Sequence, residues 1–461
     1  MAVLKVETLY FGSGAAESET DLEKVFIETP EFKDILTGRY NLVIGNKGSG
    51  KTAMYTILSK SPIPKTIVIP LSSTDGSVEH NKLFKVNSVD SITIDEFRER
   101  WKKYIAVRIA HFMISHPPNK EASEEFEDLK NLLTEVGVTE QLINAASTIN
   151  HLNDDILEKI IEFIKNDIDY TTIMSTICSL LEKWDMEAWV TIDRLDETIL
   201  SSNRKQMEAI DALLPVIKDF SGFKKIKIII FLREDMFRQL QYPHKDHFYS
   251  TTRILRWNKE NLLYMIVKRI LLNYGIKQDF TFEKAKEIFY WVFEKKIPSS
   301  NAKDSFEWIY NHLMDGHETT NPRDVVLMGN QCRDEQLSAK FATKNAIISG
   351  TAIVRAQKQV AASKFDDLQR IYPETKKILI NFSNDIVKDS YGRINKQHFT
   401  EIFSGKSEQE IEGYIRLLLN VGFLKPENKQ NPMSSQYFDI PYVYKTPLGI
   451  KSTGAKKTKK K

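Results

Sequence analysis

The feature of this sequence that most constrains its fold is the run GNKGSGKT at residues 45–52, a full match to the pattern G-x-x-x-x-G-K-[ST]. An apolar, β-branched run, Tyr40 to Ile44, precedes it, and a helical pattern from Lys51 to Ser59 follows it. Glycines let the backbone curl so that successive N–H groups face a phosphate group, and the following helix presents its positive N-terminal end to the same anion. A strand, a glycine-rich turn and a helix in this order predict an α/β fold with a phosphate-binding loop.

This loop leads us to expect a nucleoside triphosphate bound together with Mg²⁺. Lys51 would reach the β- and γ-phosphates and act in catalysis, and the hydroxyl of Thr52 would bind Mg²⁺. ATP and Mg²⁺ are therefore the expected cofactors, with ADP as the product. The residues expected to bind the nucleotide are Gly45, Asn46, Lys47, Gly48, Ser49, Gly50, Lys51, Thr52 and Ala53.

Acidic residues follow a later apolar strand, in the segment WVTIDRLDE at residues 189–197. Such a site needs a carboxylate to hold the magnesium shell and a second one to activate water. We assign Asp193, at the carboxyl end of the strand, to the metal, and Glu197, or else Asp196, to the general base. The alternative for Asp196 is that it caps the helix that follows.

A basic residue, Arg233, leaves the next apolar strand, Ile226 to Leu232. A guanidinium is always charged and matches the geometry of a phosphate, so Arg233 is expected to contact the γ-phosphate. The alternative is an exposed arginine paired with Glu234 or Asp235.

The pattern of helices and strands divides the chain into successive domains. Strands alternating with helices predict a parallel sheet covered on both faces. After the strands of this sheet, the pattern is helical almost without a break. A final region has three short helical patterns and then two β-like runs, which is the outline of a winged helix-turn-helix module. The expected domains are a P-loop core at 1–257 with a helical insertion at about 91–184, a helical lid at 258–360, a winged-helix domain at 366–445 and a basic tail at 446–461.

The winged-helix prediction depends on specific segments of the last 100 residues. The loop Pro426 to Ser435 would join the two β-like runs, and the third helix carries more acidic than basic residues, which disfavours contact with a DNA major groove. The helical patterns are Asp367 to Phe382, Lys396 to Phe403 and Ser407 to Leu419, and the β-like runs are Phe423 to Lys425 and Tyr437 to Tyr444.

Composition excludes several classes of protein. Apolar residues make up 41% of the chain and charged residues 28%, the balance of a globular protein, and no apolar run is long enough to cross a membrane. The sequence MAVLKVETLYFG at the start lacks the features of a secretion signal, and Cys178 and Cys332 form neither a zinc spacing nor a disulfide framework, so we expect a cytoplasmic location. The net charge of +3 does not by itself indicate nucleic acid, whereas five lysines within residues 456–461 form either a solvated tail or a phosphate-attracting one.

The motifs GNKGSGKT, DRLDE and LRED together resemble those of the STAND branch of AAA+ ATPases, and also of origin-recognition-like initiators. The resemblance implies a D-x-x-D-E motif at 193–197, Arg233 at the first sensor position, and a strand and first lid helix at 252–269. It further implies that Arg323, in NPRDVVL at 321–327, reaches the γ-phosphate from the lid, the alternative being a surface arginine that opens a helix. The insertion at 91–184 and the lack of a tandem-repeat sensor depart from the family.

We therefore expect a Mg²⁺-dependent regulatory ATPase that couples its nucleotide state to a partner protein or nucleic acid, and the resemblance implies a role in bacterial anti-phage defence. One alternative is a slow nucleotide switch that binds DNA or protein through the winged helix. A small-molecule kinase is the third reading, which the winged helix and the D-x-x-D-E motif disfavour. Related ATPases often complete their site with an arginine of a neighbouring subunit; Arg253 and Arg256 are weak candidates, so a homo-oligomer stays open.

Overall fold

The computed structural model describes residues 5–71, 92–118, 123–135, 169–197, 203–298, 300–302, 304–339 and 347–451. Part of the expected helical insertion, 136–168, and the lysines of the expected tail lie outside the described residues. The chain divides into two compact units: one is residues 28–255, and the other is residues 1–27 together with 256–461.

The unit at residues 28–255 is built on a five-stranded sheet in the order β2-β3-β4-β1-β5, in which every pair of neighbours is parallel. Parallel neighbours cannot be joined by tight turns, so helices must carry the chain back across the sheet. All four residues of β1 are buried, as are most of those of β3 and β4, which explains their apolar composition. The strands are β1 (Leu42–Gly45), β2 (Thr66–Pro70), β3 (Glu187–Ile192), β4 (Ile226–Arg233) and β5 (Thr252–Ile254).

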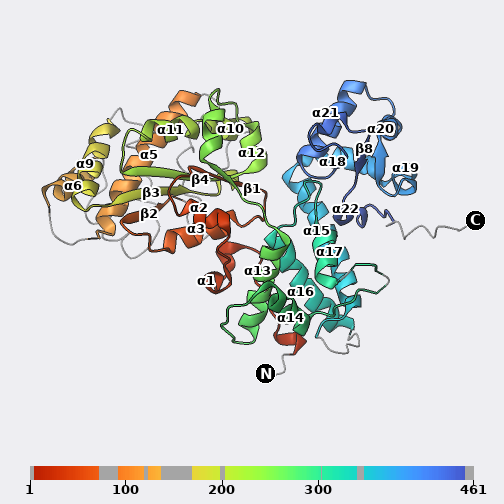
Figure 1. Cartoon of the computed structure of the whole chain (residues 1–461). Helices are drawn as coiled ribbons and strands as arrows, with labels where there is room; N and C mark the ends of the chain where they lie inside the picture. Colours follow the sequence, from red (N-terminus) through yellow and green to blue (C-terminus); the bar gives the residue numbers. More distant parts are fainter. Residues whose placement is uncertain are drawn as a thin grey trace, which may run out of the picture. The chain divides into compact units, whose positions relative to one another are not determined.

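Helices lie on both sides of this sheet: α10 and α11 on one, α2 and α3 on the other (Figure 1). Tyr55 of α3 packs edge-on against Phe231 of β4, with ring centroids 5.9 Å apart. The helices of this unit are α2 (Pro30–Ile35), α3 (Lys51–Lys60), α5 (Ile94–Ser115), α6 (Glu124–Glu135), α9 (Tyr170–Lys183), α10 (Asn203–Asp211), α11 (Leu213–Phe220) and α12 (Glu234–Gln239), with 3₁₀ turns η4 (Leu195–Glu197) and η5 (Lys245–Thr251).

The long helix α5, which falls within the expected insertion, is an integral layer of this unit. Its apolar residues belong to the same core as the sheet and pack with α10, α11 and β3. Trp101 donates its indole N–H to the carbonyl of Ala209 (2.8 Å), and Arg98 binds both carboxylate oxygens of Asp219 (2.6 and 2.8 Å). The described part of the insertion therefore supplies crossover helices between β2 and β3.

The chain between β3 and β4 forms two successive helices, α10 and α11. Pro215 explains the break, because it has no N–H to donate to the carbonyl four residues earlier, that of Asp211, where α10 ends.

His111 on α5 provides a test of this packing. Burial, and secondarily the charges of Arg108 and His116, lower the pKa of His111 to about 3. In the unfolded chain the imidazole takes up a proton near pH 6.5, whereas in the folded chain it stays neutral. The unfolded state thus binds more protons below pH 6.5, and the free energy of unfolding should fall by about 1.4 kcal/mol per pH unit as the pH decreases toward 4.

His111→Leu should remove this dependence, measured as the change with pH in the free energy of unfolding by urea. His116→Asn, a change at an exposed histidine on the same segment, should retain it. An unchanged pH dependence in His111→Leu would contradict the assignment.

The second unit contains the expected lid together with the first 27 residues. Leu9 and Phe11 are buried in one core with residues of α13, α14, α16 and α17. We expected residues 1–257 to form one core, but Leu9 and Phe11 belong to the core of the helical lid instead. The helices are α1 (Leu22–Val25), α13 (Lys259–Asn273), α14 (Phe282–Val292), α15 (Ser305–Leu313), α16 (Pro322–Ala339) and α17 (Gly350–Ile371), with 3₁₀ turns η1 (Val6–Thr8) and η2 (Ala16–Ser18).

The C-terminal part of this unit has its own apolar core and a three-stranded antiparallel sheet in the order β6-β8-β7. Its strands are β6 (Arg393–Asn395), β7 (Lys425–Pro426) and β8 (Tyr437–Asp439). Its helices are α18 (Pro373–Leu379), α19 (Asp385–Asp389), α20 (Lys396–Ile402), α21 (Glu408–Asn420) and α22 (Tyr442–Lys445), with 3₁₀ turns η6 (Ile380–Ser383) and η7 (Pro432–Ser434).

Helices followed by the β7–β8 ribbon occur in this part, but their bounds differ from those expected. The helix expected at 367–382 is divided among the end of α17, α18 and η6, because Pro373 begins a new helix, and α19 was not predicted. The short strand β6 precedes α20 and was not predicted. The β-like run expected to reach Tyr444 ends at Asp439, because Pro441, with φ −58°, stands at the start of helix α22. Within the described residues, no helix has the length and apolar character needed to span a membrane.

Candidate functional site

The loop between β1 and α3 has the backbone conformation that its glycines predict. Gly48 and Gly50 lie at φ +81° and +93°, the left-handed region that favours glycine. A Cβ atom on Gly45 would lie 2.4 Å from the hydroxyl oxygen of Ser49, so the loop closes too tightly there for any side chain. The loop ends at the first residue of α3, Lys51.

Lys51 folds back over this loop. Its ammonium donates to the carbonyl oxygens of Gly45 (3.0 Å) and Asn46 (3.2 Å). Burial lowers the pKa of Lys51, and the nearby carboxylates of Asp193 and Asp196 oppose that shift. The cation is thus held at the mouth of the loop with acidic residues beside it.

Asp193 lies next to Thr52, although its strand is not the neighbour of β1. Strand β4 lies between β3, which Asp193 follows, and β1. The carboxylate of Asp193 nevertheless accepts hydrogen bonds from the Thr52 hydroxyl and the Arg194 N–H, and α3 also contacts β4. Asp193 is only 2% exposed, and burial raises its pKa to about 6 against the opposing effects of Lys51 and Thr52.

The pair of Thr52 and Asp193 fits a magnesium ion. A hydroxyl and a carboxylate are hard oxygen donors, and Mg²⁺ in nucleotide sites takes its other ligands from phosphates and water. No cluster of three or more His, Cys, Asp or Glu side chains suited to a metal occurs among the described residues. A metal at Thr52 and Asp193 would therefore depend on the phosphates for the rest of its shell.

The segment after Asp193 turns sharply and brings two charges together. Arg194 has φ +62°, and the 3₁₀ turn η4 follows it. The guanidinium of Arg194 forms an ion pair with the carboxylate of Glu197, whose side chain is 44% exposed. Sequence reasoning assigned Glu197 as general base and missed this partner, although opposite charges three residues apart were a usable signal.

Arg233 ends β4 and lies in register with Gly45 of β1, so it stands beside the phosphate loop as expected. Its guanidinium donates to both carboxylate oxygens of Asp235 (3.0 and 2.6 Å) and to Asp196 (3.4 Å). The side chain is 12% exposed. The pairing with Asp235 agrees with the alternative, although Arg233 is largely buried and not exposed; its contact with a γ-phosphate stays a prediction.

Arg323 belongs to the other unit, where it is the second residue of α16 and donates from Nε to the carbonyl of Gly14 (2.9 Å). Its contact with a nucleotide stays a prediction. Arg253 is ion-paired with Asp34 and lies over the ring of Tyr40, 5.1 Å from its centroid.

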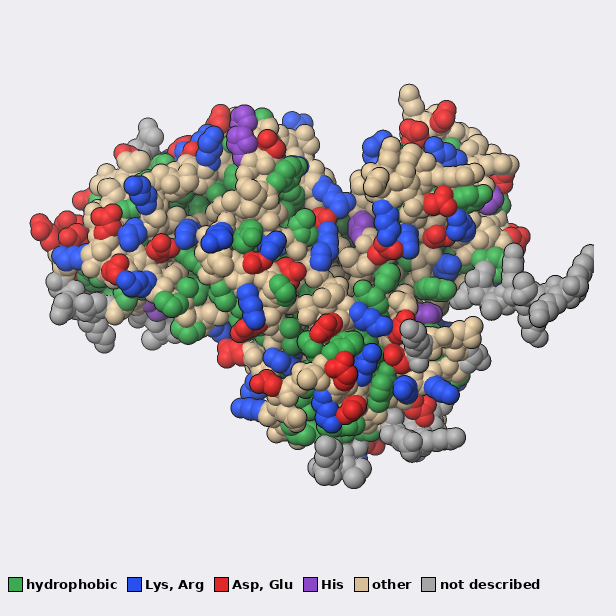
Figure 2. All heavy atoms as spheres, in the orientation of Figure 1, with side chains coloured by type: hydrophobic (Ala, Val, Ile, Leu, Met, Phe, Trp, Pro, Cys, Tyr) green, Lys and Arg blue, Asp and Glu red, His purple; other side chains and the backbone are tan. Residues whose placement is uncertain are grey.

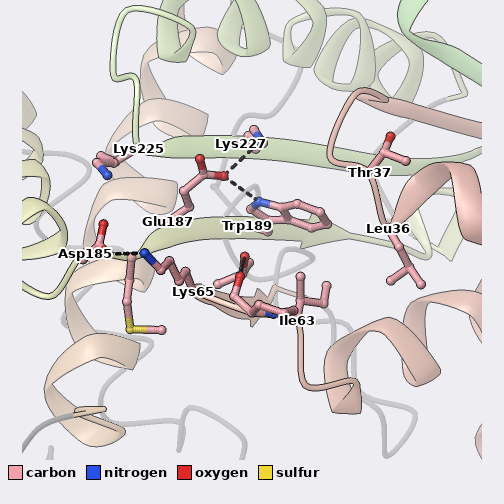
Figure 3. Close-up of a pocket in the computed structure, with 12 residues that line it drawn as sticks. Leu36, Thr37, Ile63, Lys65, Asp185, Glu187, Trp189, Lys225 and Lys227 are labelled. Atoms are coloured by element: carbon pink, nitrogen blue, oxygen red, sulfur yellow. Dashed lines mark hydrogen bonds and ion pairs between the residues drawn. The ribbon is translucent and has the colours of Figure 1, made fainter.

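A cavity of about 370 Å³ lies at the opposite edge of the sheet, where β2, β3 and β4 begin (Figure 3). Trp189 and Lys227 both donate to Glu187 (3.3 and 2.9 Å), and Lys65 pairs with Asp185. Nucleotides bind at the carboxyl ends of parallel strands, and much of the polar lining is already paired. We therefore do not assign this cavity to the nucleotide.

Comparisons with known proteins give distant relatives. No protein-family model matches the chain. It is 22% identical over 447 residues to the transposon gamma-delta 80.3 kDa protein of Escherichia coli (strain K12); the match covers 91% of this chain and 62% of that protein, less than two thirds of its length.

Three solved structures are similar only at low scores. The Aeropyrum pernix ORC2 protein, in ADPNP and ADP complexes, has a TM-score of 0.45 at 10% identity and 91% coverage of each chain. Cdc6p of Pyrobaculum aerophilum gives 0.32 at 9% identity, covering 97% of this chain and 98% of that one. The Aeropyrum pernix ORC1 protein in complex with DNA gives 0.35 at 10% identity, with 95% and 96% coverage. We base no conclusion on these scores.

Proposed function

We propose that this protein binds ATP with Mg²⁺ at the loop between β1 and α3 and hydrolyses it, using the nucleotide state to regulate a partner. The observation that carries the proposal is the convergence of Lys51, Thr52 and Asp193: the ammonium sits over the loop carbonyls while the Thr52 hydroxyl donates to the Asp193 carboxylate. This convergence supports the proposal, because a cation, a hydroxyl–carboxylate pair suited to a metal and a helix N-terminus lie together.

Each residue of the site would have a separate part in phosphoryl transfer, which depends mainly on positioning and charge neutralisation. Lys51 would exchange its contacts with the loop carbonyls for the β- and γ-phosphate oxygens. Bound Mg²⁺ would neutralise charge on those oxygens, held by Thr52 and Asp193. Glu197 would accept the proton of the attacking water, and Arg233 would contact the γ-phosphate from the end of β4.

Three existing ion pairs bear on this mechanism. Arg194 holds the carboxylate of Glu197, and Asp196 with Asp235 holds the guanidinium of Arg233. Glu197 and Arg233 would have to weaken these ion pairs in order to act on ATP. The arrangement therefore favours slow basal turnover. The same observation supports the second candidate function, a slow nucleotide switch.

Binding of ATP tests the site most directly. Lys51→Ala should weaken the affinity for Mg·ATP at least about tenfold, because a charge-assisted hydrogen bond to phosphate contributes about 1.5–3 kcal/mol. The measurement is isothermal titration calorimetry. Lys60→Ala, an exposed change on the same helix, should bind ATP as the unmodified protein does. Equal affinities of the two variants would defeat the proposed site.

The distribution of charged side chains bears on the class of partner that the protein binds. Acidic and basic side chains are interspersed over the face in Figure 2. Helix α21, the third helix of the expected winged helix, bears Glu408, Glu410 and Glu412 against one basic residue, Arg416. DNA binding requires clustered positive charge, so these features favour a protein partner over DNA. Steady-state turnover with and without duplex DNA distinguishes the two.

The wider role rests on the resemblance of the motifs to STAND and AAA+ ATPases. That resemblance supports a regulatory function beside an effector, a place in bacterial anti-phage defence and assembly into homo-oligomers. The two cysteines, both unpaired, fit the reducing cytoplasm. Phage plating on cells with and without the Lys51→Ala change would test the defence role.

A further inference from the structure

The loop between α15 and α16, residues 314–321, ends directly before Pro322 and Arg323; we call it the connector loop. Asp315 braces it from within, because its buried carboxylate accepts the N–H groups of His317 (3.0 Å) and Thr319 (3.1 Å). The hydroxyl of Thr320 donates to the carbonyl of Tyr310 in α15 (2.9 Å). The connector loop is therefore fixed to α15 and has one well-defined conformation.

Two hydrogen bonds join the connector loop to the chain that enters β7. The N–H of Gly316 donates to the carbonyl of Gly422 (2.7 Å), and Nε2 of His317 bonds the carbonyl of Leu419 (2.9 Å). A Cβ on Gly316 would lie 2.3 Å from the carbonyl oxygen of Leu424, so the two backbones approach as closely as glycine allows. The backbone of the connector loop thus touches the segment that leads into β7.

Glu318 adds a charged contact between the same two segments. One carboxylate oxygen binds the ammonium of Lys425 in β7 (2.7 Å), and the other binds that of Lys429 in the turn after β7. Glu318 has φ +58°, a conformation that disfavours residues other than glycine and asparagine. A glutamate held in that conformation between two lysines indicates that the contact is a built feature of the fold.

The other end of the connector loop is fixed as well. Asp324, next to Arg323, pairs with the ammonium of Lys364 on α17 (2.6 Å), and that ammonium also donates to the carbonyl of Leu313 at the end of α15 (3.0 Å). Both charged side chains are largely buried. A shift of Arg323 along its helix must therefore move α15, the connector loop and α17 together.

We propose that the connector loop transmits the position of Arg323 to the C-terminal sheet, and that Glu318 is the charged contact that holds the sheet to the loop. A displacement of Arg323 would act on the connector loop, whose backbone contacts the segment before β7 and whose Glu318 carboxylate binds Lys425 of β7. Breaking the Glu318 contact would free the C-terminal sheet from that motion. Only the nucleotide-dependent part of this inference rests on the proposed function.

Hydrogen–deuterium exchange of the nucleotide-free protein tests the contact itself. In Glu318→Gln, amides at 314–321 and 423–439 should exchange about two- to fivefold faster, the effect expected for the loss of exposed ion pairs. Glu287→Gln, which removes an exposed ion pair with Lys284 within α14, is the matched control and should leave both segments unchanged. The reversal Glu318→Lys with Lys425→Glu and Lys429→Glu should restore slow exchange.

A second arm compares Mg·ADP with a non-hydrolysable Mg·ATP analogue. In the unmodified protein, exchange at 423–439 should differ between the two nucleotides, and in Glu318→Gln this difference should disappear while nucleotide affinity is unchanged. Arg323→Ala should abolish the difference without altering exchange in the nucleotide-free state. Nucleotide-free exchange that is equal in Glu318→Gln and Glu287→Gln would overturn the contact; a nucleotide response that persists in Glu318→Gln would overturn the transmission. Failure to bind any nucleotide would instead refute the proposed function.

Discussion

Glu197→Gln should reduce ATP turnover by about 100- to 10,000-fold, the contribution of a general base, while the variant still binds ATP. The amide keeps the shape of the carboxylate but cannot accept a proton from the attacking water. The change leaves Lys51, Thr52 and Asp193 untouched, so the contacts proposed to hold the phosphates and the metal should persist. Single-turnover hydrolysis of radiolabelled ATP, together with a filter-binding measurement, separates the chemical step from binding.

Glu182→Gln is the matched control, because Glu182 is exposed on α9 and belongs to the same unit. Turnover in that variant should equal that of the unmodified protein. If Glu197→Gln hydrolyses ATP at the control rate, the base is another group. Asp196, the alternative expected from the sequence, would then be replaced by Asn in the same assay.

Trp101→Ala should lower the free energy of unfolding of the 28–255 unit by about 3–5 kcal/mol. The side chain is 1% exposed, packs edge-on with Tyr104 at 6.0 Å between ring centroids, and donates to the carbonyl of Ala209. Alanine would leave a cavity between α5 and α10 and an unsatisfied carbonyl. Urea denaturation followed by circular dichroism measures the loss without depending on tryptophan emission.

Two further variants show whether the loss comes from burial. Trp101→Phe retains a ring but removes the indole N–H, and should cost about 1–3 kcal/mol. Trp184→Ala, at a half-buried tryptophan in the same unit, should cost less than about half of the Trp101→Ala loss because less apolar area is removed from water. A Trp101→Ala variant as stable as Trp184→Ala would show that α5 is not part of the core.

Much of the candidate site could be predicted from sequence because each of its motifs is a short, continuous segment. The loop at 45–52 carries its conformation in its own glycines, and a strand followed by an acid places Asp193 at the carboxyl edge of the sheet. The strand order was less accessible: a carboxylate that contacts Thr52 suggests an adjacent strand, whereas the structure inserts β4 between them. Strand order depends on crossovers between distant segments, which short patterns do not record.

The features that sequence reasoning missed depend on side chains meeting across space or on very short elements. The pairing of Arg194 with Glu197 requires the left-handed turn at Arg194, a conformation that an arginine does not announce. Strand β6 has three residues and forms only because β8 pairs with it. Leu9 and Phe11 gave no period of their own, and their burial depends on helices that lie more than 250 positions later.

That discontinuity has a consequence for synthesis on the ribosome. Leu9 and Phe11 leave the exit tunnel before residues 28–255, whereas their neighbours in α13 and α14 follow only after the whole 28–255 unit has emerged. The 28–255 unit should therefore fold before the segment that carries Leu9 and Phe11 can pack, so that these two large apolar side chains stay in water in the meantime. The last event in assembly would be the return of that segment to the late helices, a closure across a long chain distance.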